Sequence, residues 1–165
     1  MKYYMSVMLP LLFFSCVVTQ TESKATKFTL KGTWEVTEVK FIGDSGLYDV
    51  DLFDLVQADC FKGSEWVLIP DNGSGKLTIL NSDLCENKIQ KIHWSLHEPG
   101  DGSFQFQFKY IDLAENESMN SNRGYLSKIK NLNSTSMIMN VNQKINDKPY
   151  EIEMTLNKIS DEIVL

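Results

Sequence analysis

The chain has 165 residues, a length that suits one domain with or without a leader. It is 42% hydrophobic and 11% aromatic, enough to build a core, which excludes wholesale disorder. Its 16 Lys and Arg residues against 22 Asp and Glu residues give a net charge of −6. This balance argues against nucleic acid as a partner, because a phosphate-binding surface needs clustered cations.

Residues 1–15 have the parts of a secretory signal peptide. Lys2 supplies a positive start, and residues 5–14 are almost wholly apolar. Ten apolar residues are too few for a transmembrane helix, which takes roughly twenty. The run Phe13-Phe14-Ser15-Cys16 resembles a bacterial lipobox, in which the cysteine is acylated and becomes the first residue of the mature protein. The alternative is a eukaryotic-type signal cut near Thr19.

Acylation of Cys16, for example with palmitate, would anchor the protein to a membrane through lipid. Residues 16–29 are then the lipidated cysteine and a flexible tether of polar composition. The two remaining cysteines, Cys60 and Cys85, are predicted to form a disulfide, because an exported chain meets an oxidising compartment. The alternative is a pair of free buried thiols.

From residue 30 to residue 160 the apolar pattern is mostly of period two, which is typical of half-buried strands. Phe104, Phe106, Phe108 and Tyr110, for example, alternate with polar residues. Eight strands are predicted, at 32–42, 65–69, 75–80, 88–96, 104–110, 123–132, 136–143 and 150–157. Turn-forming residues at 70–73, 99–102 and 146–148 join several of them. The pattern indicates an all-β fold, an eight-stranded antiparallel up-and-down barrel or a sandwich.

One segment breaks the alternation. Residues 51–59 place Leu52, Leu55 and Val56 at helical spacing. We expect one short helix here, between the first two strands, closing one end of the barrel and delivering Cys60.

Several short motifs carry a family resemblance. Gly32-Thr33-Trp34 looks like the Gly-x-Trp signature of the lipocalin barrel. The ordered set Cys60, Gly63-Ser64, Trp66, residues 75–79, Cys85, residues 92–94 and 124–125 is similar to lipocalin-like lipoproteins of the Bacteroidota. The resemblance implies an eight-stranded barrel with an open mouth on a lipid-anchored protein of the bacterial cell envelope, at the outer membrane. In that group acids soon after the acylated cysteine favour surface display; here the first is Glu22, which favours the periplasmic face.

No catalytic set emerges from the sequence, so we expect a protein that is not an enzyme and has no cofactor. His93 and His97 are four residues apart, but on a strand they lie about 13 Å apart, too far to share a metal ion. The acids Asp49, Asp51, Asp54 and Asp59 lack the glycine and the terminal glutamate of a calcium loop. No metal site is predicted.

The apolar interior remains as the candidate site. An eight-stranded barrel is just wide enough either to pack solid or to hold one small ligand, and the sequence leaves both open. The candidate cavity residues are Trp66, Leu68, Trp94, Phe104, Phe106, Phe108, Tyr125, Met139 and Met154.

The first function hypothesis is a barrel that binds a small hydrophobic or amphipathic ligand. The second is a packed, non-catalytic interaction module of an envelope complex, with residues 116–122 as its candidate surface. Gly32 and Trp34 are expected to be structural, because a buried indole can close the barrel floor.

Overall fold

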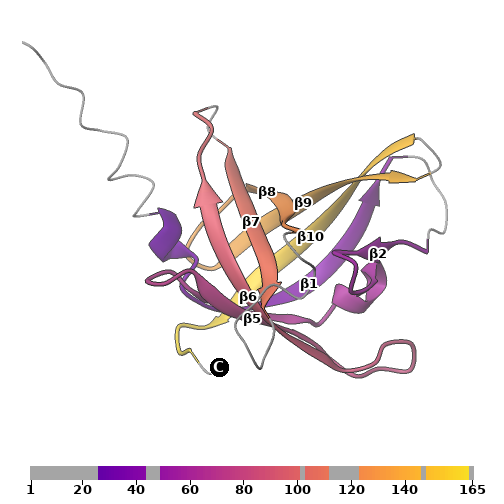
Figure 1. Cartoon of the computed structure of the whole chain (residues 1–165), viewed down its shortest axis with the longest axis horizontal. Helices are drawn as coiled ribbons and strands as arrows, with labels where there is room; N and C mark the ends of the chain where they lie inside the picture. Colours follow the sequence, from indigo (N-terminus) through magenta and orange to yellow (C-terminus); the bar gives the residue numbers. More distant parts are fainter. Residues whose placement is uncertain (1–25, 44–48, 101–102, 112–122, 146–147, 164–165) are drawn as a thin grey trace, which may run out of the picture.

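The computed structural model describes residues 26–43, 49–100, 103–111, 123–145 and 148–163 (Figure 1). Ten strands, one short 3₁₀ helix and a helical turn at residues 26–29 lie in this part of the chain. In chain order they are β1 (Gly32–Ile42), β2 (Asp51–Leu52), β3 (Val56–Gln57), η1 (Ala58–Phe61), β4 (Glu65–Ile69), β5 (Ser74–Ile79), β6 (Lys88–His97), β7 (Phe104–Ile111), β8 (Tyr125–Lys130), β9 (Ser136–Ile145) and β10 (Lys148–Ser160).

Eight of the strands form a closed antiparallel barrel in the order β1-β10-β9-β8-β7-β6-β5-β4, which confirms the predicted fold class. The barrel closes because β1 pairs with β10 along most of its length and with β4 over Gly32–Glu35. Every other contact in the wall joins strands that are neighbours in sequence, as in an up-and-down barrel. The eight predicted strands differ from the observed ones only in their ends.

Alternation of burial explains why these segments are strands. In β10 the side chains of Tyr150, Ile152, Met154 and Leu156 are buried, and the residues between them are partly or fully exposed. Such a pattern keeps one face of a strand on the core and the other in water. The inward residues of all eight strands join in one hydrophobic core.

The predicted helix at residues 51–59 is wrong. The segment forms a two-stranded hairpin of β2 and β3, followed by the single 3₁₀ turn η1. Leu52 and Val56, four residues apart, are cross-strand partners in this hairpin and not neighbours on a helix face. A short hairpin and a helix turn can share the same apolar spacing, so the pattern did not separate them. Cys60 does lie in η1, as part of the connection to β4.

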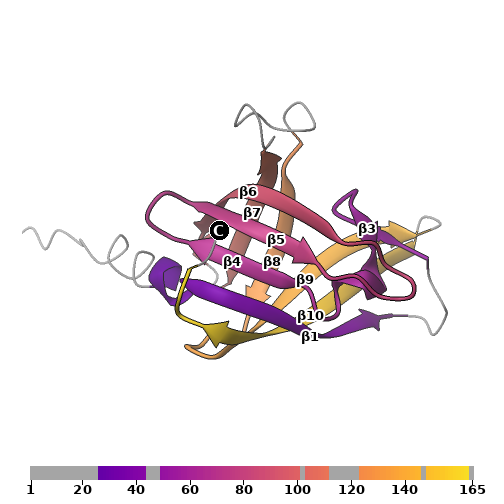
Figure 2. The same ribbon diagram turned by 90° about the horizontal axis from the view of Figure 1, so that it is seen from below.

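The two ends of the barrel are closed by different elements. A helical turn at residues 26–29 lies at one end, and the β2–β3 hairpin lies at the other (Figures 1 and 2). The predicted signal peptide, Cys16 and residues 116–122 lie outside the described residues. Within the described part, no helix has the length and apolarity needed to cross a membrane.

Candidate functional site: the barrel interior and its hairpin plug

The predicted cavity residues do point into the barrel, where they pack against one another. Seven of the nine are buried, namely Trp66, Leu68, Trp94, Phe106, Phe108, Met139 and Met154, while Phe104 and Tyr125 are half-buried. Five of them, including Trp66 and Phe106, have an exposed fraction of 0%. A side chain with no exposed surface touches neither solvent nor a void of the size of water. The middle of the barrel is therefore filled by its own side chains in this conformation.

The end near the helical turn, which we call the lower end, is closed by Trp34. Its indole N–H donates to the carbonyl oxygen of Leu30 at 2.9 Å, so the buried polar group has a partner. The Lys158 ammonium lies 5.0 Å from the centre of the same ring. Gly32 has φ +119, and a Cβ there would overlap the carbonyl oxygen of Ser160, which explains the glycine before this tryptophan.

The opposite end, which we call the upper end, is closed by Phe53, at the tip of the β2–β3 hairpin. Its ring is only 3% exposed and makes edge-on contacts with four other rings. The ring centres of Phe108, Phe61, Tyr125 and Trp66 lie 4.9, 5.6, 5.7 and 6.2 Å away. Phe53 thus fills the upper part of the interior although it belongs to a connection and not to the wall. We call the turn Leu52–Leu55, with the Phe53 ring, the plug.

The backbone of the plug is unusual. Leu55 N–H donates to Leu52 O at 3.1 Å, and the two residues between them, Phe53 and Asp54, have φ +56 and +51. This left-handed region favours glycine, and each non-glycine residue there costs roughly 1–2 kcal/mol. Residues held in such conformations gather at binding and switch sites, so the plug is the first place to look for function.

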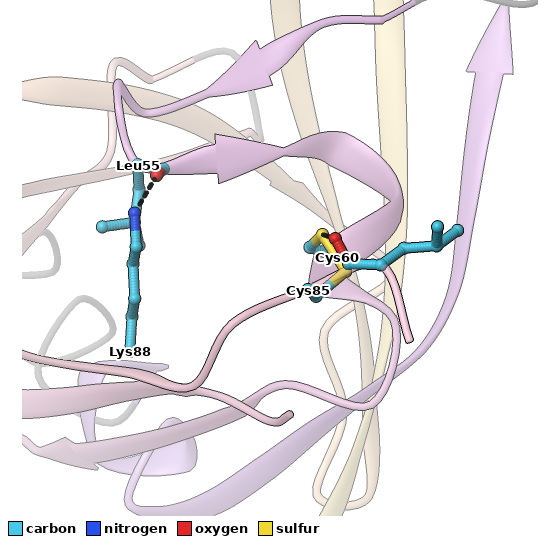
Figure 3. The surroundings of a disulfide bond; sticks show 5 residues. Leu55, Cys60, Cys85 and Lys88 are labelled. Atoms are coloured by element: carbon cyan, nitrogen blue, oxygen red, sulfur yellow. Dashed lines mark hydrogen bonds between the residues drawn. A yellow bond between two sulfur atoms is a disulfide. The ribbon is translucent and has the colours of Figure 1, made fainter. Parts of the chain in front are cut away.

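Four polar contacts fasten the plug to the wall. Tyr110 Oη donates to Phe53 O at 3.1 Å, and Tyr125 Oη donates to Asp54 Oδ2 at 3.1 Å. Arg123 pairs with the Asp54 carboxylate at 2.7 Å. Lys88 Nζ donates to Leu55 O at 3.0 Å (Figure 3). The Arg123 and Asp54 side chains are 67% and 44% exposed, so this ion pair contributes about 0–1 kcal/mol.

Tyr110 is the one buried titratable group among these contacts. Burial, and then the neighbouring Tyr125 and Asp54, raise the pKa of its hydroxyl far above the ordinary value of 10. The group is therefore protonated throughout the neutral range and can only act there as a hydroxyl, donating toward the plug.

The predicted disulfide between Cys60 and Cys85 is present, with the two Cα atoms 5.6 Å apart. It joins η1, which follows the plug, to the β5–β6 connection (Figure 3). The base of the hairpin is thus covalently fixed while its tip is held by side-chain contacts alone.

Among the described residues, three buried side chains have polar atoms without a hydrogen-bond partner, those of Ser64, Trp66 and Asn140. The Trp66 ring packs edge-on against Phe53, in the part of the core that the Phe53 ring fills, which we call the aromatic chamber, and its N–H has no hydrogen-bond acceptor. The Asn140 amide is unpaired on the outer face of β9, at the level where the Lys130–Glu151 ion pair crosses that strand. An unsatisfied buried group costs about 1–3 kcal/mol. In the chamber, an acceptor on a bound molecule would remove that cost.

A hollow of about 270 Å³ lies directly outside the plug. Its lining includes Asp51, Phe53, Asp54, Arg123, Tyr125 and Asn142, and it is mostly polar. Beside this hollow the wall strands β8 and β9 are hydrogen-bonded along only a short stretch, Lys128–Lys130 of β8. The plug therefore separates an apolar, aromatic chamber from a polar vestibule.

The other residues considered from sequence do not come together. His93 and His97 are both exposed on β6, and Asp49, Asp51 and Asp59 are exposed around the hairpin. Among the described residues, no three His, Cys, Asp or Glu side chains are grouped so that they could hold a metal ion.

Sequence reasoning missed Phe53, Arg123 and the pairing role of Asp54. Phe53 lies in a segment that was expected to be helical, and its positive φ leaves no mark in the sequence because glycine is absent. Arg123 is the chain's one arginine. A single arginine in a chain with an excess of acids is a candidate for binding a carboxylate, and this was the sequence signal for Arg123.

No family model matches the chain, and no curated protein matches it. Solved structures of bovine odorant-binding protein, a lipocalin with an eight-stranded barrel, are similar in fold. The structure of that protein with its natural ligand has 12% identity and a TM-score of 0.40, over 79% of this chain and 72% of the other. Its complex with a selenium-containing odorant has 13% identity and a TM-score of 0.42, over 81% of this chain and 72% of the other. The complex with undecanal has 13% identity and a TM-score of 0.40, over 79% of this chain and 71% of the other.

Proposed function

We propose that this chain is a lipid-anchored protein of the bacterial cell envelope whose lipocalin-like barrel binds a small hydrophobic or amphipathic molecule. The observation that carries the proposal is the place of Phe53. Its ring occupies the top of the apolar chamber, yet it comes from a connecting hairpin, so it can leave without breaking a strand of the wall. Withdrawal of the ring would open a space lined by Phe61, Trp66, Phe108 and Tyr125.

Two further observations support binding in this chamber. The buried Trp66 N–H has no acceptor among the described residues, and a ligand could supply one. Beyond these rings the core contains Met137, Met139 and Met154, whose unbranched side chains can adapt to different shapes. For a ligand that competes with Phe53, the apparent association constant is the intrinsic constant multiplied by the fraction of molecules in which the plug is open.

Native mass spectrometry tests this function. The full-length chain, purified gently from its own envelope, is expected to carry an extra mass that is lost on denaturation. In Phe53→Ala the occupancy should rise, because the competing ring is absent. Phe28→Ala is the matched control, since Phe28 is a half-exposed phenylalanine next to the other end of the barrel. Bare protein in all three forms would overturn the proposal.

The alternative is a non-catalytic interaction module with a permanently packed barrel. It is favoured by the unexposed interior and by Leu84, whose side chain is 90% exposed. Leu84 lies in the turn 82–85, which is closed by two backbone hydrogen bonds between Ser82 and Cys85 and braced by the disulfide. On this hypothesis Leu84→Asp, or deletion of residues 116–122, should remove a co-purifying protein. Unchanged co-purification would exclude it.

A further inference from the structure

The plug has the chemistry of a bound molecule. Its aromatic ring lies among four rings, its carbonyl oxygen accepts from Tyr110, and its carboxylate is held by Arg123 and Tyr125. These three groups belong to two adjacent residues, Phe53 and Asp54. We propose that they occupy the places of a ligand's own groups, and that the ligand is an amphipathic aromatic carboxylate with a carbonyl between its ring and its acid. This inference rests on the proposed function and names the ligand class of the same site.

The apolar half of the argument is geometric. Edge-on contacts at 4.9 to 6.2 Å on four sides favour a flat ring over a branched or linear alkyl group, because each contact sets a positive ring edge against a negative ring face. The space that Phe53 vacates therefore suits a phenyl group.

The polar half is a matter of pairing. When the plug withdraws, the buried Tyr110 hydroxyl loses its acceptor and Arg123 loses its carboxylate partner. A neutral apolar ligand would leave the hydroxyl unsatisfied, which is costly for a buried donor. A ligand with a carbonyl and a carboxylate restores both contacts, and the vestibule of about 270 Å³ gives its acidic end room beside Arg123.

Charge makes the carboxylate assignment specific. The chain carries an excess of acids, and Arg123 is its one arginine. A guanidinium can bind a carboxylate through two parallel hydrogen bonds, and it is placed here at the mouth of an aromatic chamber. Displacement also releases two non-glycine residues from the left-handed region, which offsets part of the cost of moving the plug.

A matched pair of probes tests the ligand class. N-(3-phenylpropanoyl)-β-alanine has the same sequence of bonds from ring to carbonyl to carboxylate as Phe53-Asp54. Its primary carboxamide keeps the shape and loses the charge. We would titrate both into the full-length chain in lipid nanodiscs by isothermal calorimetry, with empty nanodiscs subtracted. The acid is expected to bind about two- to fivefold more tightly than the amide, the effect of one ion pair whose partners are exposed.

Three variants complete the experiment. Arg123→Gln should abolish the preference for the acid. Lys128→Gln removes an exposed cation on β8, the strand that follows Arg123, and should leave the preference unchanged. Phe53→Ala should strengthen the binding of both probes by removing the competing ring. Equal binding of the two probes, or a preference that survives Arg123→Gln, would overturn the ligand class.

The two proposals can fail separately. If neither probe binds, even to Phe53→Ala, while native mass spectrometry shows a bound molecule, the ligand class is wrong and the binding function stands. If the protein is also bare in the mass spectrometer, both are wrong.

Discussion

The two ends of the barrel are closed in contrasting ways. At the lower end, Trp34 and Trp94 stand on wall strands, and their indole N–H groups donate to the backbone oxygens of Leu30 and Ser74. At the upper end, a ring on a connecting hairpin is held by side chains, including an exposed ion pair. The lower closure is part of the wall itself, whereas the upper closure lies on a connection outside the wall. This difference supports the proposal that a ligand would enter at the plug.

The largest expected effect is at the lower end. Trp34→Ala removes a fully buried ring and the hydrogen bond to Leu30, and should lower the free energy of unfolding by about 3–5 kcal/mol. Urea denaturation followed by circular dichroism measures this loss. Trp34→Phe, which keeps most of the ring volume, serves as the control and should lose less. A loss below 1 kcal/mol for Trp34→Ala would contradict the structural role of this end.

Removal of the disulfide tests how firmly the hairpin base is fixed. The double variant Cys60→Ala, Cys85→Ala opens a loop with a sequence separation of 25 residues. The expected loss is about 3.5 kcal/mol in the chain-entropy model. Denaturation of the wild-type chain under reducing conditions should give a similar loss. If the double variant unfolds at the wild-type urea concentration, the bond does not constrain the hairpin.

A smaller effect is expected from the hydroxyl that holds the plug. Tyr110→Phe leaves the Phe53 carbonyl without its donor and should lower the free energy of unfolding by about 1–2 kcal/mol. The wild-type chain should also lose stability as the pH rises above 10. There the unfolded chain releases the Tyr110 proton and the folded chain keeps it, because the folded pKa is raised. Denaturation at pH 9 and pH 11 should show a smaller alkaline loss in Tyr110→Phe.

The smallest effect belongs to the exposed ion pair. Arg123→Gln should lower the free energy of unfolding by less than about 1 kcal/mol. Thermal unfolding at low and high salt measures this change, and the difference from wild type should shrink as salt screens the pair. A loss comparable to that of Trp34→Ala would show that the upper end is as rigidly built as the lower one.

The sequence was sufficient to predict the wall and insufficient to predict the plug. Alternation of apolar and polar residues, as in β7 and β10, is a direct result of strand geometry, so all eight strands could be located. The disulfide could be predicted from the two remaining cysteines together with the expectation that the chain is exported. At Leu52–Leu55 the same apolar spacing fits a helix turn and a short hairpin, and the choice is made by tertiary contacts. Phe53 can occupy the chamber only because Trp66, Phe108 and Tyr125, distant in sequence, surround it.

The position of the helical turn at residues 26–29 sets the end of the barrel at which a membrane anchor would be attached. The chain enters the barrel at the Trp34 end, and the plug lies at the opposite end (Figures 1 and 2). With the lipid on Cys16 that we propose, the tether would join the barrel at its closed floor, so the anchor would not cover the plug. Molecules could then reach the plug from solution or from a passing partner.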